Sequence, residues 1–457
     1  MIVTYKAFDY TWDQILQRVG YLNNPPFNIQ YGDLKKEGSN GIPKVKIYRS
    51  TDDQWHELIK LKVGELCWSD KKDFLPNNHD LQISNRIPIL FPDKKDLTPP
   101  LIEYDKEDNS IEIKFDLIAA CFFMLSRWEE TVVPERDQHN RFSAGSSVAY
   151  RQGFLNQPIV DEYALIIRTW LNYLIPDLNL TIYQPSLQLT HDIDFINRFI
   201  NPWKVFEYGF KEVKTFGLLK GIKNTRVKYS FEKKHPESTD YVNSIKNLAL
   251  ISRELSLNSI FFFQAANQSP FDSGYDIRKQ FMTQLFSFLK ENGQKIGLHS
   301  SYFSNDDYSR MKKEYELLGD ATNQFISRCR QHYLRIDVPR FWQIEEKIGI
   351  TDDYSLGYAS QEGFRAGTCH PFQVYDVDNQ RKIELVEHPL ILMDTTIKNY
   401  KKLSIVDARA LIFQLALKCH NVGGDFSILW HNTSLSDKWQ NWGILYKEII
   451  TEIRNLF

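Results

Sequence analysis

The chain has 457 residues, of which 42% are apolar, 14% aromatic and 25% charged. This is the composition of a globular protein, and it excludes a disordered or collagen-like chain. Lys and Arg (56) nearly balance Asp and Glu (58), and the resulting net charge of −2 argues against a nucleic-acid-binding protein. At about 150 residues per domain, the length predicts two or three domains.

The five cysteines are few, odd in number and widely spaced, and no two have C-x-x-C spacing. We therefore expect neither a disulfide framework nor a zinc site built from cysteines. The N-terminus has no basic region followed by an apolar run, and the longest apolar run, Leu117–Leu125, is too short to cross a bilayer. These features predict a soluble, cytoplasmic protein without a transmembrane segment.

Residues 1–180 are predicted to form an N-terminal α/β domain. Strands are expected where short apolar stretches lie between turn signals, at residues 42–50, 85–92 and 109–116. The nearly continuous apolar run at residues 115–130 predicts a buried helix, and helical spacing over 160–175 predicts another. Pro176 then interrupts the helical pattern, which places the end of this domain near residues 176–185.

Residues 183–457 alternate strand-like apolar runs with helical patterns. This alternation predicts parallel βα units, arranged as a (β/α) barrel or a doubly wound sheet. The expected strands are residues 187–190, 259–265, 295–298, 333–336, 383–393 and 426–430. One helix is expected over 277–293 with Gly293 as its stop, and two others after caps at Asn305 and Ser436.

An insertion at about residues 196–258 separates the first two of these strands. Between Asn201 and His235 it has nine Lys and Arg against three Glu, a formal charge of +6. Aromatic residues are interleaved with these charges, at Trp203, Phe206, Phe210 and Phe216. The insertion is therefore either a solvated helical excursion or a surface that contacts anionic lipid or an anionic substrate.

Polar residues gather at the ends of several predicted strands. Asp192 and Asp194 follow the first strand, and they point the same way if the strand extends that far. His299 ends the third strand, Arg330 to Tyr333 flank the fourth, and His431 follows the last. Each cluster alone also fits a turn, a helix cap or a structural histidine. Together, at the strand ends where barrel enzymes carry their active sites, they predict a metal site with a general acid and base.

The order Thr-x-Asp-x-Asp, His-x-Ser, Arg-x-x-Tyr and Leu-x-His resembles the motifs of the polysaccharide deacetylase (NodB-homology) family. The resemblance covers residues 183–457 and implies a distorted (β/α) barrel. It implies Asp192 as catalytic base, His431 as general acid, and Asp194 and His299 as metal ligands. It also implies that Arg330 holds the base. We expect the substrate to contact Tyr333, Leu429, Trp430, His332 and Arg365.

The implied metal is a divalent cation, and we expect zinc. In the family a second histidine of the His-Ser motif also binds the metal, but in this chain that position is Phe303. Because zinc sites usually have three protein ligands, a further ligand is expected from His191, His332 or His370. The acidic residue that activates the general acid is expected to be Asp353 or Asp394.

Segments at residues 122–130, 136–142 and 363–372 are similar to those of bacterial members of the family that carry an uncharacterised N-terminal domain. The charged residues Arg127, Glu129, Glu130, Arg136 and Arg141 are expected either to tie the two domains together or to form a substrate surface.

The resemblance implies a hydrolase that removes acetyl groups from an N-acetylated or O-acetylated sugar or glycan in surface-polysaccharide metabolism. Two alternatives remain open. One is an inactive barrel that only binds glycan, and the other is a glycosyltransferase that uses Asp192-Ile193-Asp194 as a metal-binding D-x-D motif. The chain has no glycine-rich phosphate-binding loop that would indicate a nucleotide cofactor.

Overall fold

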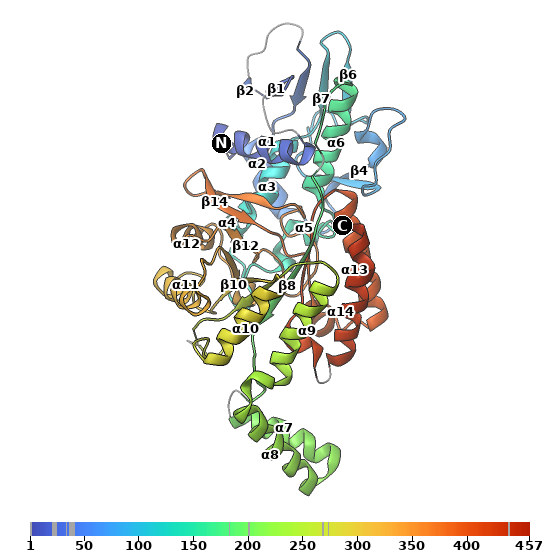
Figure 1. The fold of residues 1–457 in the computed structure, drawn as a ribbon. Coiled ribbons are helices and arrows are strands. Elements are labelled where there is room, and N and C mark those ends of the chain that lie inside the picture. The colour runs from blue at the N-terminus through green and yellow to red at the C-terminus, as the bar shows by residue number, and fades with distance from the viewer. Residues whose placement is uncertain are drawn as a thin grey trace.

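The computed structural model describes residues 2–20, 25–32, 34–35, 42–181, 183–199, 202–266, 269–272, 274–436 and 439–457. The fold is mixed α/β, as the sequence predicts, and it is built on a five-stranded and a nine-stranded sheet (Figure 1). None of the described helices is both long and apolar enough to span a membrane.

The five-stranded sheet lies in the N-terminal part of the chain and has the order β2-β1-β3-β7-β6. Strands β1, β3 and β7 are parallel, and the edge strands β2 and β6 run antiparallel to their neighbours. Strands β4 and β5 form a separate antiparallel pair. The strands are β1 (Asn28–Tyr31), β2 (Leu34–Lys35), β3 (Lys44–Ile47), β4 (Cys67–Asp70), β5 (Arg86–Ile89), β6 (Ile102–Asp105) and β7 (Ser110–Ile113). The three strands predicted here correspond to β3, β5 and β7.

Helix α3 is the centre of this part, because all of its residues are apolar and buried. Asp116 caps it by accepting a hydrogen bond from the backbone N–H of Ala119 at 2.8 Å. The single helix expected over 115–130 is in fact two helices, because Arg127 adopts a positive φ of 54° between them. The helices are α1 (Tyr5–Val19), α2 (Asp52–Lys60), α3 (Leu117–Leu125), α4 (Trp128–Val132), α5 (Val148–Arg151) and α6 (Ile159–Leu174).

The nine-stranded sheet has the order β13-β14-β12-β11-β10-β9-β8-β16-β15. All neighbouring strands are parallel except β13, which runs antiparallel to β14. The described residues form no ladder between the edge strands β13 and β15, so the predicted closure into a barrel is not detected. The strands are β8 (Leu187–Ile193), β9 (Ser259–Phe263), β10 (Lys295–Ser300), β11 (Arg328–Gln331), β12 (Asp352–Asp353), β13 (Phe372–Asp376), β14 (Arg381–Glu387), β15 (Leu392–Met393) and β16 (Phe426–Leu429).

Helices connect these strands, and two predicted caps are wrong. Asp307, and not Asn305, caps α11 by accepting from the backbone N–H of Arg310. Trp439 precedes α14, while the Ser436 hydroxyl donates to the carbonyl of Thr433 instead of capping that helix. Gly293 follows α10 with a φ of 75°, as predicted. The helices are α7 (Pro202–Phe216), α8 (Leu218–Lys234), α9 (Asp240–Glu254), α10 (Gln280–Glu291), α11 (Tyr308–Thr322), α12 (Arg340–Ile348), α13 (Ile405–Asn421) and α14 (Gln440–Ile453).

One strand of this sheet is displaced from its predicted position. A strand was expected over 333–336, but β11 is formed by Arg328–Gln331 and a single turn of 3-10 helix, η4 (His332–Leu334), follows it. Tyr333 and Leu334 have positive φ values of 62° and 53°, which a strand does not accommodate. The shift places His332 and Tyr333 after the C-terminal end of β11.

The two parts of the chain share one hydrophobic core. Helix α1 packs against β13 and β14, and the hydroxyl of Tyr10 donates to the backbone carbonyl of Gln373 at 2.8 Å. The buried carboxylate of Glu130 binds the guanidinium groups of both Arg127 (2.8 Å) and Arg365 (2.6 Å). Glu130 therefore ties the two parts together, which agrees with the first of the two alternatives for Glu130 and Arg127.

Candidate metal centre and active site

A cavity of about 280 Å³ lies at the C-terminal end of the parallel strands. Asp192 reaches it from the end of β8, and Asp194 from the residue after that strand. His299 comes from β10, His332 from the turn after β11, and His431 from the segment after β16. Parallel pairing of these strands brings the polar clusters of four separate segments to one edge of the sheet, as the sequence predicts.

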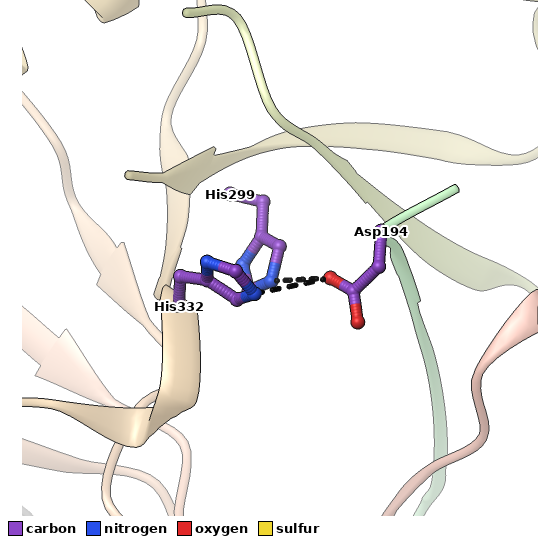
Figure 2. Close-up of side chains that lie close together, drawn as sticks. All are labelled: Asp194, His299 and His332. Atoms are coloured by element: carbon purple, nitrogen blue, oxygen red, sulfur yellow. Dashed lines mark ion pairs between the residues drawn. The ribbon is translucent and has the colours of Figure 1, made fainter. Parts of the chain in front are cut away.

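Three side chains converge on one point of this cavity (Figure 2). The Nε2 atoms of His299 and His332 lie 3.3 and 3.5 Å from the same oxygen, Oδ1 of Asp194. The ligand atoms of the three residues all lie within 4.8 Å of one another. Two imidazoles and a carboxylate are a typical protein ligand set for zinc.

The other ring nitrogens of the two histidines leave Nε2 available to a metal. Nδ1 of His299 lies 2.8 Å from the carbonyl oxygen of Arg330, and Nδ1 of His332 lies 3.1 Å from Oδ1 of Asp272. A carbonyl oxygen only accepts hydrogen bonds, so Nδ1 of His299 is a donor. Nδ1 of His332 contacts both the Asp272 carboxylate and the side-chain amide of Gln264, at 3.0 Å, and these contacts turn Nε2 of the ring toward Asp194. Metal-binding histidines are commonly oriented by such partners.

The charge state of Asp194 also fits a cation. Its Oδ1 atom is buried and accepts no hydrogen bond from the described residues. Burial raises the pKa of this carboxyl, but the neighbouring His299, His332 and His431 outweigh that effect and hold the pKa well below its usual range. The three residues therefore present an ionised carboxylate oxygen and two imidazole nitrogens to one point of the cavity.

His431 lies across the cavity, with Nε2 3.7 Å from Oδ2 of Asp194. Its Nδ1 lies 2.7 Å from Oδ1 of Asp394. Burial lowers the pKa of His431, but the charge and hydrogen bond of Asp394 raise it to about 10, so the ring is protonated at neutral pH. Of the two acidic partners considered from sequence, Asp394 contacts this histidine, whereas Asp353 accepts a hydrogen bond from the backbone N–H of Ser355.

Asp192 lines the cavity between the metal ligands and a buried arginine. Its Oδ2 lies 3.7 Å from Nε2 of His299, and its Oδ1 lies 3.9 Å from Nε of Arg330. The guanidinium of Arg330 is fully buried and lies over the ring of Phe262, 5.1 Å from its centroid. Its nitrogens find no hydrogen-bond partner among the described residues. The arginine therefore acts on Asp192 mainly as a fixed positive charge.

The N-terminal part of the chain supplies one wall of the cavity. Arg141 lines it and donates a hydrogen bond to the backbone carbonyl of Tyr333 at 2.8 Å, while Asp137 holds the same guanidinium at 2.8 Å. The ring of His139 lies 4.8 Å from that of Tyr333, measured between centroids. Because Tyr333 directly follows His332, residues 137–141 brace the turn that carries this histidine.

A family model described as a family of unknown function (DUF7033) matches residues 6–176. No curated protein matches the chain.

Several solved structures resemble part of the chain at low identity. A protein assigned as a polysaccharide deacetylase from Mycobacterium smegmatis is 14% identical, with a TM-score of 0.39, over 60% of this chain and 85% of its own. A family 4 carbohydrate esterase from Streptomyces lividans, in complex with acetate, is 13% identical, with a TM-score of 0.28, over 60% of this chain and 88% of its own. A CE4 family pseudoenzyme from Bacillus anthracis is 10% identical, with a TM-score of 0.27, over 61% of this chain and 66% of its own.

Seven of the ten predicted site residues line the cavity, and three do not. The cavity is lined by Asp192, Asp194, His299, His332, Tyr333, Leu429 and His431, and Arg330 lies behind Asp192. Trp430 is buried, with its ring centroid 5.2 Å from that of Tyr446, and Arg365 is buried against Glu130. The expectation that Trp430 and Arg365 contact a substrate is corrected, because both side chains are packed inside the protein.

The structure also distinguishes between the histidines considered as the third metal ligand. Phe303 is 40% exposed and packs on Tyr302, with ring centroids 5.0 Å apart, so its ring belongs to the surface. His191 and His370 are buried elsewhere, with ring nitrogens 2.8 and 3.1 Å from the backbone carbonyls of Trp430 and Val422. Of the three histidines considered from sequence, only His332 therefore joins Asp194 and His299.

One residue of the site was missed by sequence reasoning. Asp272, which orients His332, lies in the segment after β9, and its position after a parallel strand was a usable signal. Arg141 is among the charges expected either to tie the domains together or to form a substrate surface, but nothing in the sequence indicates that it reaches the turn after β11.

Proposed function

We propose that the protein is a metal-dependent hydrolase that removes acetyl groups from an N-acetylated or O-acetylated sugar or glycan. On this proposal residues 183–457 are its deacetylase-like (NodB-homology) unit. One observation supports the proposal: three candidate metal ligands, the carboxylate of Asp192 and a protonated imidazole share one cavity. Amide hydrolysis needs an activated water, a stabilised oxyanion and a proton for the leaving amine, and these groups match those needs.

Asp194, His299 and His332 would hold a divalent cation, which we propose is zinc. When bound at such a site, the cation lowers the pKa of water and polarises the acyl carbonyl. Three protein ligands are the number usual in catalytic zinc sites, which keep a further position for water or substrate. Asp272 and the carbonyl of Arg330 contact Nδ1 of the two rings and turn Nε2 of each toward the proposed cation.

Asp192 is the proposed general base. Its carboxylate lines the cavity, with Oδ1 on the side of Arg330 and Oδ2 3.7 Å from Nε2 of His299, so Oδ2 is the oxygen placed to accept a proton. It takes that proton from the water whose oxygen adds to the acetyl carbon. Arg330 lies behind it as a fixed positive charge and keeps the carboxylate in place.

His431 is the proposed general acid. As the bond between the acetyl carbon and the sugar nitrogen or oxygen breaks, Nε2 gives its proton to the leaving atom, and acetate and the free amine or alcohol result. Asp394 binds Nδ1, so the protonated Nε2 faces the cavity. A transfer of this kind typically contributes about 10²–10⁴ in rate.

The cavity also offers a place for the acetyl methyl group. Leu429, Leu334 and Met393 belong to one small apolar cluster and all three line the cavity. Burying a methyl against such a surface is favourable by roughly 0.8 kcal/mol. Tyr333 lines the same cavity and is the aromatic residue that we propose contacts the sugar.

Acetate release tests the proposal. Purified protein loaded with zinc is incubated with acetylated chito-oligosaccharides and, separately, with acetylated xylan. We expect acetate from at least one substrate, and its loss in Asp192→Asn and His431→Ala. His420→Ala and Asp320→Asn, at exposed positions outside the cavity, are matched controls that keep activity. Wild-type rates in both active-site variants would refute these roles.

Binding measurements distinguish the proposed hydrolase from the other two functions considered from sequence, a glycan-binding protein and a glycosyltransferase. A protein that only binds glycan would bind chito-oligosaccharide and release no acetate at any metal loading. A D-x-D glycosyltransferase would bind a nucleotide-sugar together with manganese. The position of Asp194 is less suited to that role, because its carboxylate faces two imidazoles.

A further inference from the structure

Helices α7 and α8 form a hairpin that projects from one end of the molecule, opposite the five-stranded sheet (Figure 1). The two helices pack closely on each other. Gly221 lies at their contact, where a Cβ atom would come within 2.4 Å of the backbone nitrogen of Val213. The hairpin is therefore a packed helical pair, and the side chains on its outer surfaces are available to contact a partner.

Large apolar side chains are exposed on this hairpin at an unusual density. Among the described residues, 25 large hydrophobic side chains are exposed, and ten of these lie within residues 202–234. Their exposed fractions run from 39% to 86%. They are Trp203, Phe206, Phe210, Phe216, Leu218, Leu219, Ile222, Val227, Tyr229 and Phe231. Single exposed apolar residues are ordinary, but a concentration of them marks an interaction surface.

The same hairpin is strongly basic. Residues 202–234 contain nine Lys and Arg against three Glu, a formal charge of +6. Lys204 and Lys211 pair with Glu207, and Lys228 pairs with Asp240. The remaining bases form no ion pair with the described acidic side chains, and these are Lys214, Lys220, Lys223, Arg226, Lys233 and Lys234.

Helical periodicity groups the apolar residues into faces. Trp203, Phe206 and Phe210 recur at i, i+3 and i+7, and therefore share one face of α7. Leu218 and Ile222 are four residues apart and share a face of α8. Lysines lie beside these faces, and their long apolar stems allow the side chains to lie along an apolar surface while the ammonium groups stay in water.

We infer that the α7–α8 hairpin is a docking surface for an anionic lipid bilayer. Helices that lie in the interface combine aromatic and aliphatic side chains with Lys and Arg, and their binding depends on both terms. Each base near an anionic membrane contributes about fivefold in affinity, because its attraction amounts to ~1 kcal/mol. Aromatic side chains such as Trp203 favour the headgroup level.

The chemistry of the surface disfavours other occupants. A soluble polyanion would satisfy the bases but leave the ten apolar side chains in water. A second copy of the chain would bring two +6 surfaces together, and like charges across an interface oppose association. A bilayer of anionic lipid satisfies both the apolar and the basic residues at once.

The position of the hairpin relates docking to the candidate active site. Strand β8 ends at Ile193, and α7 begins at Pro202, so the hairpin leaves from the same end of the sheet as the catalytic cavity. Phe195 lines that cavity and also a larger one of about 560 Å³, which α7 forms with the segments carrying Tyr241 and Trp439. A docked hairpin would bring this end of the sheet close to the membrane surface.

Vesicle binding by the full chain tests the inference and does not depend on the proposed activity. Protein is sedimented with vesicles of phosphatidylcholine alone and with vesicles that also contain phosphatidylglycerol. We expect binding only to the anionic vesicles and weaker binding at high salt. The triple variants Trp203→Ser/Phe206→Ser/Phe210→Ser and Lys220→Glu/Lys223→Glu/Arg226→Glu should each bind at least about tenfold more weakly.

Matched controls place equal changes elsewhere. Phe325 and Val406 are 70% and 76% exposed outside the hairpin, and Phe325→Ser/Val406→Ser should bind as wild type. Thermal unfolding of every variant shows whether the fold is kept. The fluorescence of Trp203, obtained as the difference between wild type and Trp203→Phe, should shift to shorter wavelength on binding, because the exposed indole enters the interface.

Three outcomes would overturn the inference. The first is that the wild type does not bind anionic vesicles. The second is that the apolar triple variant binds these vesicles and the soluble polyanion heparin as tightly as wild type, which would indicate a surface that recognises charge only. The third is a self-association of the wild type in solution that the same triple variant abolishes, which would indicate an interface between copies.

Discussion

Asp394 binds His431 at two points. Its Oδ1 lies 2.7 Å from Nδ1 of the ring, and its Oδ2 accepts the backbone N–H of the same residue at 2.9 Å. The Ser434 hydroxyl donates to Oδ2 as well. This arrangement fixes both the position and the protonation of the ring, so it can be tested by changing Asp394 alone.

Asp394→Asn should slow acetate release from an N-acetyl substrate by about 10²-fold or more, because the ring loses the charge that keeps its proton. The loss should be much smaller on 4-nitrophenyl acetate, whose leaving group departs without protonation. The measurement is the ratio of kcat on the two substrates in wild type and variant. Asp320→Asn, at an exposed position, should leave this ratio unchanged. Equal losses on both substrates would show that His431 does not protonate the leaving group.

His332→Ala should weaken zinc binding by about 10²-fold or more, because it removes one of three ligands. Asp272→Ala should weaken it by about 10–100-fold, because the ring loses the acceptor that orients it. Zinc affinity is measured by competition with a chelator of known affinity.

Phe303→His is the critical comparison for the metal site. The Phe303 side chain is 40% exposed and packs on Tyr302. Phe303→His should therefore not raise the zinc affinity of the otherwise unchanged protein, and it should not restore zinc affinity when combined with His332→Ala. Restoration would mean that the third ligand belongs at position 303 and that the turn after β11 rearranges.

The metal site shows what the sequence could and could not predict. The positions of Asp194 and His299 at the cavity were predictable, because each follows an apolar run that is typical of a buried parallel strand, while their role as metal ligands is what the family resemblance implies. His332 was harder to place. The strand before it, Arg328–Gln331, is polar in sequence, and Cys329, Arg330 and Gln331 are nevertheless buried. An apolar pattern therefore pointed to residues 333–336, where two positive φ values rule out a strand.

Closure of the sheet and the burial of individual side chains depend on contacts between distant parts of the chain, and a local residue pattern does not predict them. The strand order follows from parallel βα units, but closure of the sheet depends on how its edges β13 and β15 lie, and no local signal fixes that. Trp430 is aromatic, Arg365 is charged, and both lie in or beside segments that resemble family motifs. These properties favoured a role in substrate contact. Their burial against Tyr446 and Glu130 is a matter of tertiary packing.

Arg141 should position the metal ligand that follows β11. It donates to the carbonyl of Tyr333, next to His332, and Arg141→Ala should therefore lower both kcat/KM and zinc affinity by about tenfold. Arg141→Lys should recover only part of this, because an ammonium group lacks the planar fork that reaches Asp137 and the carbonyl together.

A control in the same segment separates positioning from stability. Arg136 donates to backbone carbonyls of Val133 and Glu130 and does not line the cavity, so Arg136→Ala should leave zinc affinity unchanged. If zinc affinity in all three variants simply follows their melting temperatures, Arg141 has only a structural role.

Arg365→Ala should destabilise the fold strongly. The change removes one of two guanidinium groups from the buried carboxylate of Glu130, and breaking a buried pair from one side costs about 3–5 kcal/mol. Arg381→Ala removes an exposed partner of Glu346 and should cost less than about 1 kcal/mol. Urea unfolding measures both. A cost for Arg365→Ala no larger than that for Arg381→Ala would show that Arg127 alone satisfies Glu130.

His191 should make the stability of the protein depend on acidity. It is fully buried, its Nδ1 donates to the carbonyl of Trp430 at 2.8 Å, and burial lowers its pKa to about 4. An unfolded histidine has a pKa of about 6.5. Above pH ~6.5 the ring is neutral in both states and adds no pH dependence.

Between pH ~6.5 and about 4, the unfolded chain gains a proton on His191 that the folded protein does not, so the free energy of unfolding falls with falling pH. The fall attributable to this residue is about 3 kcal/mol at most, and it ends below the folded pKa. His191→Asn keeps a donor toward Trp430 but cannot titrate. Its stability deficit relative to wild type should be constant above pH ~6.5 and should shrink by up to about 3 kcal/mol as the pH falls to 4. Chemical unfolding across this range measures the deficit, and a deficit that does not vary with pH would mean that the folded protein protonates His191 as readily as the unfolded chain.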